Sequence, residues 1–310
     1  MKVLTTLFPV FFMLGVGFLA RVRGWITPEQ KDGAKTLVFG ILFPILIFNA
    51  IFTAQLSVST ALIVLYVTAA FIVSWIIGTF TAKYTSGRFA HLTPYLMTTC
   101  EGGNVALPLY TTIVGAGYAI NTVTFDLAGV VLAFILIPAA VAVKTSGSMD
   151  LKALLKNMMK NSFVIASVLG LVLNLCGVYG MLSASPLLDL YSGAVNAAIA
   201  PVSGVILFTL GYDLNADTEM LKPIAGASLA RFLTGGLIIA GFFLFFPSLM
   251  ADHIFRTAVL LYFMCPTGFA TPSQVRPLCK DTSEEQFMSS FVSMYMIITL
   301  IVYIVIVLAG

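Results

Sequence analysis

The chain has 310 residues, of which 59% are hydrophobic and only 9% are charged, and its mean hydropathy is +1.03. Soluble domains carry about 25% charged residues, so this composition excludes a soluble globular protein. No short alternating segments of a transmembrane barrel appear, and the net charge of +3 gives no sign of a nucleic-acid partner. We therefore expect an all-α polytopic membrane protein.

Ten apolar segments are long enough to cross a bilayer, which takes about 20 residues. They fall near residues 4–21, 34–53, 60–82, 90–114, 119–143, 162–180, 186–211, 222–247, 253–275 and 286–309. Arg21 and Arg23 directly follow the first segment, and no clear small-residue cleavage site precedes them. We interpret this segment as a retained helix and not as a signal peptide.

Lysine and arginine alternate from loop to loop. Thirteen of the sixteen basic residues fall in the odd-numbered loops. Because cytoplasmic loops carry the excess of lysine and arginine, the odd loops are predicted to be cytoplasmic and both termini to be outside. We expect a multi-pass protein of the plasma membrane, which in a bacterium is the inner membrane.

The polar loop 144–161 divides the ten segments into halves of five, residues 1–143 and 162–310. An odd number of helices per half inverts the second half relative to the first. Pro44 and Pro201 are 157 residues apart, and the first segments of the two halves start with the same offset. Proline and glycine are common in membrane helices in any case, but two matching pairs favour an inverted repeat.

Residues 97–112 break the fourth segment at a depth where a membrane helix should be apolar. The stretch contains Glu101, Gly102, Gly103, Asn104 and Pro108. Placing a carboxylate near the bilayer centre raises the free energy of membrane insertion by about 2.5–3.5 kcal/mol, so such a group usually faces a cavity or a partner. Open backbone at this depth is tolerated only inside protein or beside water, where transporters bind solutes.

The ninth segment is interrupted at the matching position of the second half. Residues 265–274 contain Pro266, Gly268 and Pro272, and they end in Gln274. We expect breaks at Pro108, Pro266 and Pro272. Paired interrupted helices are the best sequence indication of a transport site.

Several motifs resemble the auxin efflux carrier family, which includes plant PIN auxin carriers and bacterial malate and malonate permeases. The resemblance is carried by residues 24–26, 35–38, 43–48, 106–109 and 265–266. It implies two inverted five-helix repeats whose fourth and ninth helices cross beside the substrate. It also implies a scaffold of helices 1, 2, 6 and 7, a transport unit of helices 3–5 and 8–10, a homodimer formed through the scaffold, and an organic-anion substrate.

The chain departs from the family pattern at Glu101, where the family usually has asparagine seven residues before the crossover proline. Asn104 lies one turn closer to the proline. The carboxylate suggests a proton or a sodium ion at this position, because burial in a low dielectric favours its neutral form. The alternative is that Glu101 only caps freed N–H groups. Asp126 is a candidate second ion ligand, although its position near a loop favours the outer interface.

The remaining candidates could bind an anionic solute. They are Asn49, Thr98, Thr99, Gly103, Asn104, Arg231, Thr267 and Gln274. The alternatives are that the hydroxyls and amides satisfy broken backbone, that Asn49 joins two helices, and that Arg231 extends toward the cytoplasmic interface. The functional interpretation of Arg231 is that it attracts the anion or pairs with Glu101 or Asp126, and this is as much expected as its extension toward the interface.

No catalytic or nucleotide-binding motif occurs, so we expect neither an enzyme nor a cofactor other than a coupling ion. Asp213, Asp217 and Glu219 could hold a metal, but a solvated loop is the simpler interpretation. We expect a secondary active transporter of a small organic anion, such as malate, malonate or an auxin-like acid, working by alternating access with proton or sodium coupling. The alternative is a channel-like pore or a uniporter built from the same broken helices.

Overall fold

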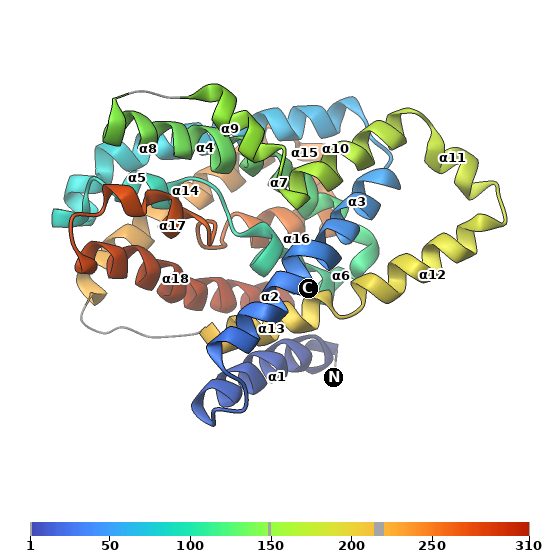
Figure 1. The fold of residues 1–310 in the computed structure, drawn as a ribbon, viewed down its shortest axis with the longest axis horizontal. Helices are drawn as coiled ribbons and strands as arrows, with labels where there is room; N and C mark the ends of the chain where they lie inside the picture. The colour runs from blue at the N-terminus through green and yellow to red at the C-terminus, as the bar shows by residue number, and fades with distance from the viewer. Residues whose placement is uncertain (1, 148–149, 214–219, 310) are drawn as a thin grey trace. The chain divides into compact units, whose positions relative to one another are not determined.

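A computed structural model describes residues 2–147, 150–213 and 220–309 (Figure 1). All the regular structure in these residues is helical, which confirms the expected all-α class. By length and composition, seven helical stretches can cross a membrane. They are Leu4–Val22, Pro28–Phe52, Val58–Thr85, Ala116–Ser146, Leu187–Asp213, Leu221–Phe245 and Thr282–Ala309. Ser162–Leu175 is a shorter apolar helix.

The chain divides into two compact units, and each is described by itself. Unit 1 comprises residues 2–58, 103–123 and 158–213 of the described chain. Its helices are α1 (Lys2–Val22), α2 (Pro28–Leu37), η1 (Val38–Leu42), α3 (Phe43–Phe52), η3 (Gly102–Ala106, from Gly103), α6 (Leu107–Val114), η4 (Ala116–Tyr118), α10 (Ser162–Leu175), α11 (Val178–Ser183), α12 (Leu187–Ile199) and α13 (Val202–Asp213).

Unit 2 comprises residues 59–102, 124–157 and 220–309, without residues 148 and 149. Its helices are α4 (Val58–Thr85, from Ser59), η2 (Gly87–Phe89), α5 (Thr93–Met97), α7 (Ile120–Val131, from Thr124), η5 (Leu132–Leu136), α8 (Ile137–Ser146), α9 (Leu151–Met158, to Asn157), α14 (Leu221–Phe245), α15 (Pro247–Ala251), α16 (His253–Tyr262), α17 (Thr271–Val275), η6 (Arg276–Leu278) and α18 (Thr282–Ala309).

In unit 1, glycines allow α1 to pack closely along α13. A Cβ on Gly17 would overlap the carbonyl oxygen of Phe208, and one on Gly211 would overlap that of Leu14. Small residues are common where membrane helices approach closely, because lipid supplies no hydrophobic driving force between them. The glycines therefore set the spacing of this helix pair.

The second membrane stretch of unit 1 begins earlier than the sequence suggested. Thr27, the N-cap, and Gln30, the third residue of α2, form a reciprocal capping box at the helix start, and the helix then continues through a π turn into α3. Such a box satisfies two of the backbone N–H groups left free at a helix start. The polar residues that we expected in the first loop are therefore partly helical.

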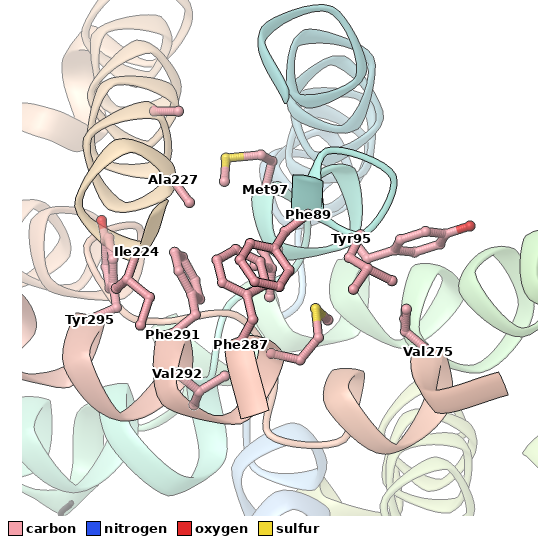
Figure 2. Packing of buried hydrophobic residues seen from close by; sticks show 14 of the residues in the cluster. Phe89, Tyr95, Met97, Ile224, Ala227, Val275, Phe287, Phe291, Val292 and Tyr295 are labelled. Atoms are coloured by element: carbon pink, nitrogen blue, oxygen red, sulfur yellow. The ribbon is translucent and has the colours of Figure 1, made fainter. Parts of the chain in front are cut away.

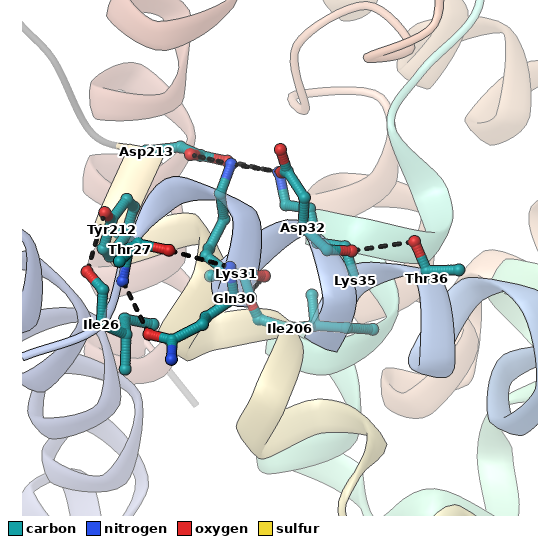
Figure 3. A network of polar contacts seen from close by, with 11 residues as sticks. Ile26, Thr27, Gln30, Lys31, Asp32, Lys35, Thr36, Ile206, Tyr212 and Asp213 are labelled. Carbon is teal, nitrogen blue, oxygen red and sulfur yellow. Dashed lines mark hydrogen bonds and ion pairs between the residues drawn. The ribbon is translucent and has the colours of Figure 1, made fainter.

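A polar network joins α2 to the end of α13 (Figure 3). Lys31 is buried, and its Nζ lies 3.0 Å from Asp213 Oδ1 and 2.7 Å from Asp32 Oδ1. Lys35 pairs with the other oxygen of Asp213. This pairing accounts for Asp213, whereas Asp217 and Glu219 lie outside the described residues.

The apolar core of unit 2 packs α5, α14, α17 and α18 together (Figure 2). Phe89 and Phe287 stack with ring centroids 4.3 Å apart, and both rings are buried. Tyr295 of α18 belongs to the same cluster and lies under the guanidinium of Arg231. The cluster thus fixes α14 beside the start of the first interrupted stretch.

Candidate functional site at two unwound segments

The first unwound segment comprises residues 98–101, between the end of α5 and the π turn at Gly102. Thr99 has φ of 54°, and it is the one non-glycine residue with positive φ in the described chain. This conformation is a strained outlier for a β-branched residue, at a cost of about 1–3 kcal/mol. Surrounding contacts must therefore hold the segment in place.

The second unwound segment comprises residues 263–270, between the end of α16 and the start of α17. Pro266 lies within it, and Pro272 is in the first turn of α17. Proline is well tolerated in a first helical turn, because its missing N–H has no partner there. Pro272 therefore restarts the helix after the gap.

The two unwound segments bind each other through their backbones. The N–H of Glu101 donates to the carbonyl of Pro266 at 2.8 Å, and the N–H of Phe269 donates to the carboxylate of Glu101. Glu101 is only 7% exposed. Because one residue makes both bonds, Glu101 joins the two unwound segments directly.

Threonine hydroxyls complete the junction. Thr267 donates its hydroxyl to the carbonyl of Thr98 at 2.9 Å, and the hydroxyls of Thr99 and Thr267 lie 3.2 Å apart. The hydroxyl of Thr98 donates to the carbonyl of Phe71 on α4. Three of the expected solute-binding residues therefore meet here, with these hydroxyls satisfying the open backbone.

Arg231 of α14 binds both unwound segments through their carbonyl oxygens. It is 3% exposed, so it does not extend toward the interface as one interpretation had it. Its guanidinium donates to the carbonyl oxygens of Leu96 at 2.7 Å, of Thr99 at 2.6 Å and of Cys265 at 3.0 Å. These bonds make Arg231 a clamp on the backbone.

Asp126 of α7 contacts α16 within unit 2. The hydroxyl of Tyr262 donates to its Oδ1 at 2.7 Å. A Cβ on Gly102 would overlap the carboxylate, so glycine is what lets Asp126 approach the chain next to Glu101.

Three of the predicted residues belong to unit 1. Asn49 accepts a hydrogen bond from the hydroxyl of Tyr191 at 2.8 Å, which joins α3 to α12. Gly103 lies where a Cβ would overlap the ring of Phe43. Asn104 belongs to the π turn of unit 1. Because these residues are in the other unit, their part in solute binding stays a prediction.

Gln274 of α17 in unit 2 donates its amide to the carbonyl of Ala133 at 2.7 Å. Its Oε1 is buried without a hydrogen-bond partner in the described chain. A buried acceptor of this kind is costly to leave unsatisfied. Gln274 therefore keeps an acceptor available that a donor on a solute could satisfy.

The expected break at Pro108 is wrong. Pro108 is buried at the start of α6, and a continuous helical turn of residues 102–106 precedes it. A π turn shifts the hydrogen-bond register, which accommodates the missing N–H of proline without unwinding the chain. The unwinding occurs at residues 98–101, where Arg231 and the second unwound segment satisfy the backbone.

Sequence reasoning missed Tyr262, which ends α16 and is fully buried. A tyrosine next to an interrupted membrane helix carries a hydroxyl that must find a partner. That requirement was the available signal. The sequence alone did not identify Asp126 as the partner, because the two residues are 136 positions apart.

The site combines one guanidinium with two carboxylates, so one negative charge is in excess when both acids are ionised. Hydroxyl and carboxylate oxygens are the ligands that hard cations prefer. A proton on one of the two acids, or a monovalent cation beside it, would neutralise this excess negative charge. The arrangement is therefore suited to exchanging one positive charge.

Comparison with known protein families finds that the family described as membrane transport protein matches residues 2–151. No curated protein matches the chain. Together with the long apolar helices, the match makes this an integral multi-pass membrane protein. The matched family consists of transporters, which confirms the expectation that the chain is not an enzyme.

Proposed function

Because residues 2–151 match the family described as membrane transport protein, to which the auxin efflux carriers belong, we propose that the chain is a secondary active transporter of a small organic anion. The substrate class is a carboxylate such as malate, malonate or an auxin-like acid. Transport proceeds by alternating access and is coupled to protons or sodium ions. The observation that carries the proposal is the buried carboxylate of Glu101, which bridges the two unwound segments.

Charge explains how an ion and an anion would be coupled at this junction. Glu101 and Asp126 repel any anion that enters their surroundings, and Arg231 offsets only one of them. At about 6 Å between a carboxylate and the anion, and at an effective dielectric constant of about 20, one uncompensated carboxylate makes the binding free energy of the anion less favourable by about 3 kcal/mol. A proton or a sodium ion at Glu101 removes that cost. The ion and the anion therefore favour each other's binding.

The same bridge links ion binding to shape. Protonation of Glu101 weakens the charge-assisted hydrogen bond from Phe269, and the strained backbone at Thr99 is then held by fewer contacts. Release of the ion restores the bond. The charge on one side chain thus biases the closed and open forms of the junction, as alternating access requires.

We place this chemistry in the predicted layout of ten helices in two inverted repeats, 1–143 and 162–310. The division into two compact units supports a scaffold and a transport unit, because unit 1 holds the first, second, sixth and seventh predicted segments. Lys83 and Lys144, from the third and fifth loops, line one pocket of unit 2, as loops on one side of the membrane would. We propose a homodimer through the scaffold, in the plasma membrane, with both termini outside.

Uptake into proteoliposomes tests the function. Purified protein is reconstituted, a sodium or pH gradient is imposed, and accumulation of labelled malonate and malate is followed, after a thermal-shift screen of carboxylates in sodium and potassium buffers. We expect gradient-driven, saturable uptake with trans-stimulation. Unitary currents without trans-stimulation would instead support the channel-like pore, and equilibration without accumulation would support a uniporter.

Replacing Glu101 with glutamine tests the role of the carboxylate. The amide keeps the shape and can still accept from Phe269, but it carries no charge. We expect Glu101→Gln to abolish the dependence of uptake on the ion gradient. Asp150→Asn, which removes an exposed carboxylate at the start of α9, is the matched control. Full gradient dependence in the Glu101→Gln protein would show that this role is wrong.

A further inference from the structure

A basic pocket of about 410 Å³ lies in unit 2, away from the unwound segments. Its walls come from the last turns of α4, the residues that lead into α5, and the end of α8. Lys83, His91 and Lys144 supply its polar side, and Trp75 and Phe80 supply its apolar side. The transport chemistry proposed above uses none of these five residues.

The pocket carries positive charge without a carboxylate of its own. Lys83 and Lys144 form no ion pair with any residue in the described chain, and no acidic residue belongs to the lining. Glu284 approaches from α18, but its carboxylate lies 3.2 Å from His91 and accepts the N–H of Lys280 at 2.7 Å. Two ammonium groups therefore face the pocket without a counter-charge, which favours an anion there.

The apolar side of the pocket continues along α4 as an exposed stripe. Val73, Ile76, Phe80 and Lys83 follow one another at helical spacing, and Phe80 is 73% exposed. Large apolar side chains exposed on a membrane helix face lipid tails. The stripe therefore leads from the lipid-facing surface directly to a basic end.

An aromatic pair marks the depth of the pocket. Trp75 packs against Tyr95 with ring centroids 5.3 Å apart, and the Nζ of Lys144 lies 5.2 Å from the centre of the Tyr95 ring. Tryptophan and tyrosine are enriched at the level of the lipid headgroups. Lys83 follows Trp75 by two helical turns, about 12 Å along the axis, which exceeds the depth of one headgroup layer of roughly 5–8 Å, so the pocket is long enough to extend from the headgroups toward the acyl chains.

We propose that this pocket binds the headgroup of one anionic phospholipid. Lys83 and Lys144 contact the phosphate, and an acyl chain lies along the stripe beside Phe80. Basic pockets between membrane helices on the cytoplasmic side are suited to anionic headgroups, and the odd loops that carry both lysines are predicted to be cytoplasmic. The apolar stripe distinguishes a lipid from a free phosphate, which would use only the basic end.

Native mass spectrometry of the full chain in neutral detergent tests the proposal. The protein is titrated with dioleoyl phosphatidylglycerol, with dioleoyl phosphatidylcholine and with glycerol 3-phosphate. We expect phosphatidylglycerol to bind in preference to both others. Replacing both lysines, as Lys83→Gln with Lys144→Gln, is expected to weaken that binding about 30-fold, at about fivefold for each lysine near an anionic lipid.

Two further double variants separate charge at the pocket from charge in general. Lys83→Arg with Lys144→Arg keeps both charges and is expected to keep the binding. Lys152→Gln with Lys156→Gln removes two exposed lysines from α9, outside the pocket, and is expected to change it little. Only variants that are as monodisperse as the wild type and have the same melting temperature are compared.

Three results would overturn the proposal. Equal binding of phosphatidylglycerol and phosphatidylcholine would show that charge does not matter. An equal loss of phosphatidylglycerol binding in the Lys83→Gln with Lys144→Gln protein and in the Lys152→Gln with Lys156→Gln protein would show that the lipid binds elsewhere. Glycerol 3-phosphate binding as tightly as phosphatidylglycerol would identify a soluble phosphate site. None of these results depends on whether the protein transports an organic anion.

Discussion

Replacing Arg231 with methionine should release the junction of the two unwound segments. The side chain keeps its apolar volume under Tyr295 but loses every donor to the carbonyls of Leu96, Thr99 and Cys265. A buried carbonyl left without a donor costs about 1–3 kcal/mol. Taking the lower value for three carbonyls gives about 3 kcal/mol, because neighbouring effects do not simply add.

Labelling of Cys265 measures this release directly. The thiol of Cys265 is buried and reacts with a maleimide only when the second unwound segment opens. A loss of about 3 kcal/mol in the free energy of opening raises the labelling rate about 150-fold when opening is fast and unfavourable. Peptide mass spectrometry separates Cys265 from the other three cysteines.

Lys222→Met is the control, because it removes an exposed positive charge from the same helix, α14, without touching the junction. We expect its labelling rate to match that of the wild type. If the Arg231→Met protein remains folded and Cys265 is labelled no faster than in this control, the idea that Arg231 clamps the backbone is refuted.

Two further predictions concern packing within each unit. Gly226→Ala in α14 should destabilise unit 2 by about 1–3 kcal/mol, because the new Cβ would overlap the carbonyl of Thr85 on α4. The control Gly236→Ala, whose Cβ would meet nothing within 4 Å, should leave the stability unchanged or raise it. Equal melting temperatures of the Gly226→Ala and Gly236→Ala proteins would contradict this prediction. Lys31→Met should destabilise unit 1 by about 1–2 kcal/mol through the buried contact with Asp213, as read from thermal unfolding, and an unchanged melting temperature would show that the network adds nothing.

The sequence predicted the helical class and the existence of the interruptions well, because apolar length and membrane-depth polar residues are local signals. It placed the first interruption too late. Gly102 and Gly103 looked like helix breakers, yet they begin the helix and give Asp126 and Phe43 room to approach. The residues that open the chain are threonines 98 and 99, whose own preferences do not reveal it.

The rest of the site depended on contacts distant in sequence. Arg231 binds carbonyls more than 130 residues earlier in the chain, and a carbonyl acceptor leaves no mark on residue identity. Asp126 and Tyr262 meet for the same kind of reason. Sequence reasoning found the charged groups, because charge inside a membrane helix is conspicuous, but it could not find what each group contacts.

The most direct test of the account is the linkage between solute and ion binding at Glu101. The dissociation constant of the solute identified by thermal shift is measured in purified protein across sodium concentrations and across pH, for the wild type and for Glu101→Gln. We predict that sodium or acid tightens binding in the wild type by up to about 100-fold and that the tightening disappears in the variant. An unchanged ion dependence in the Glu101→Gln protein would contradict the account.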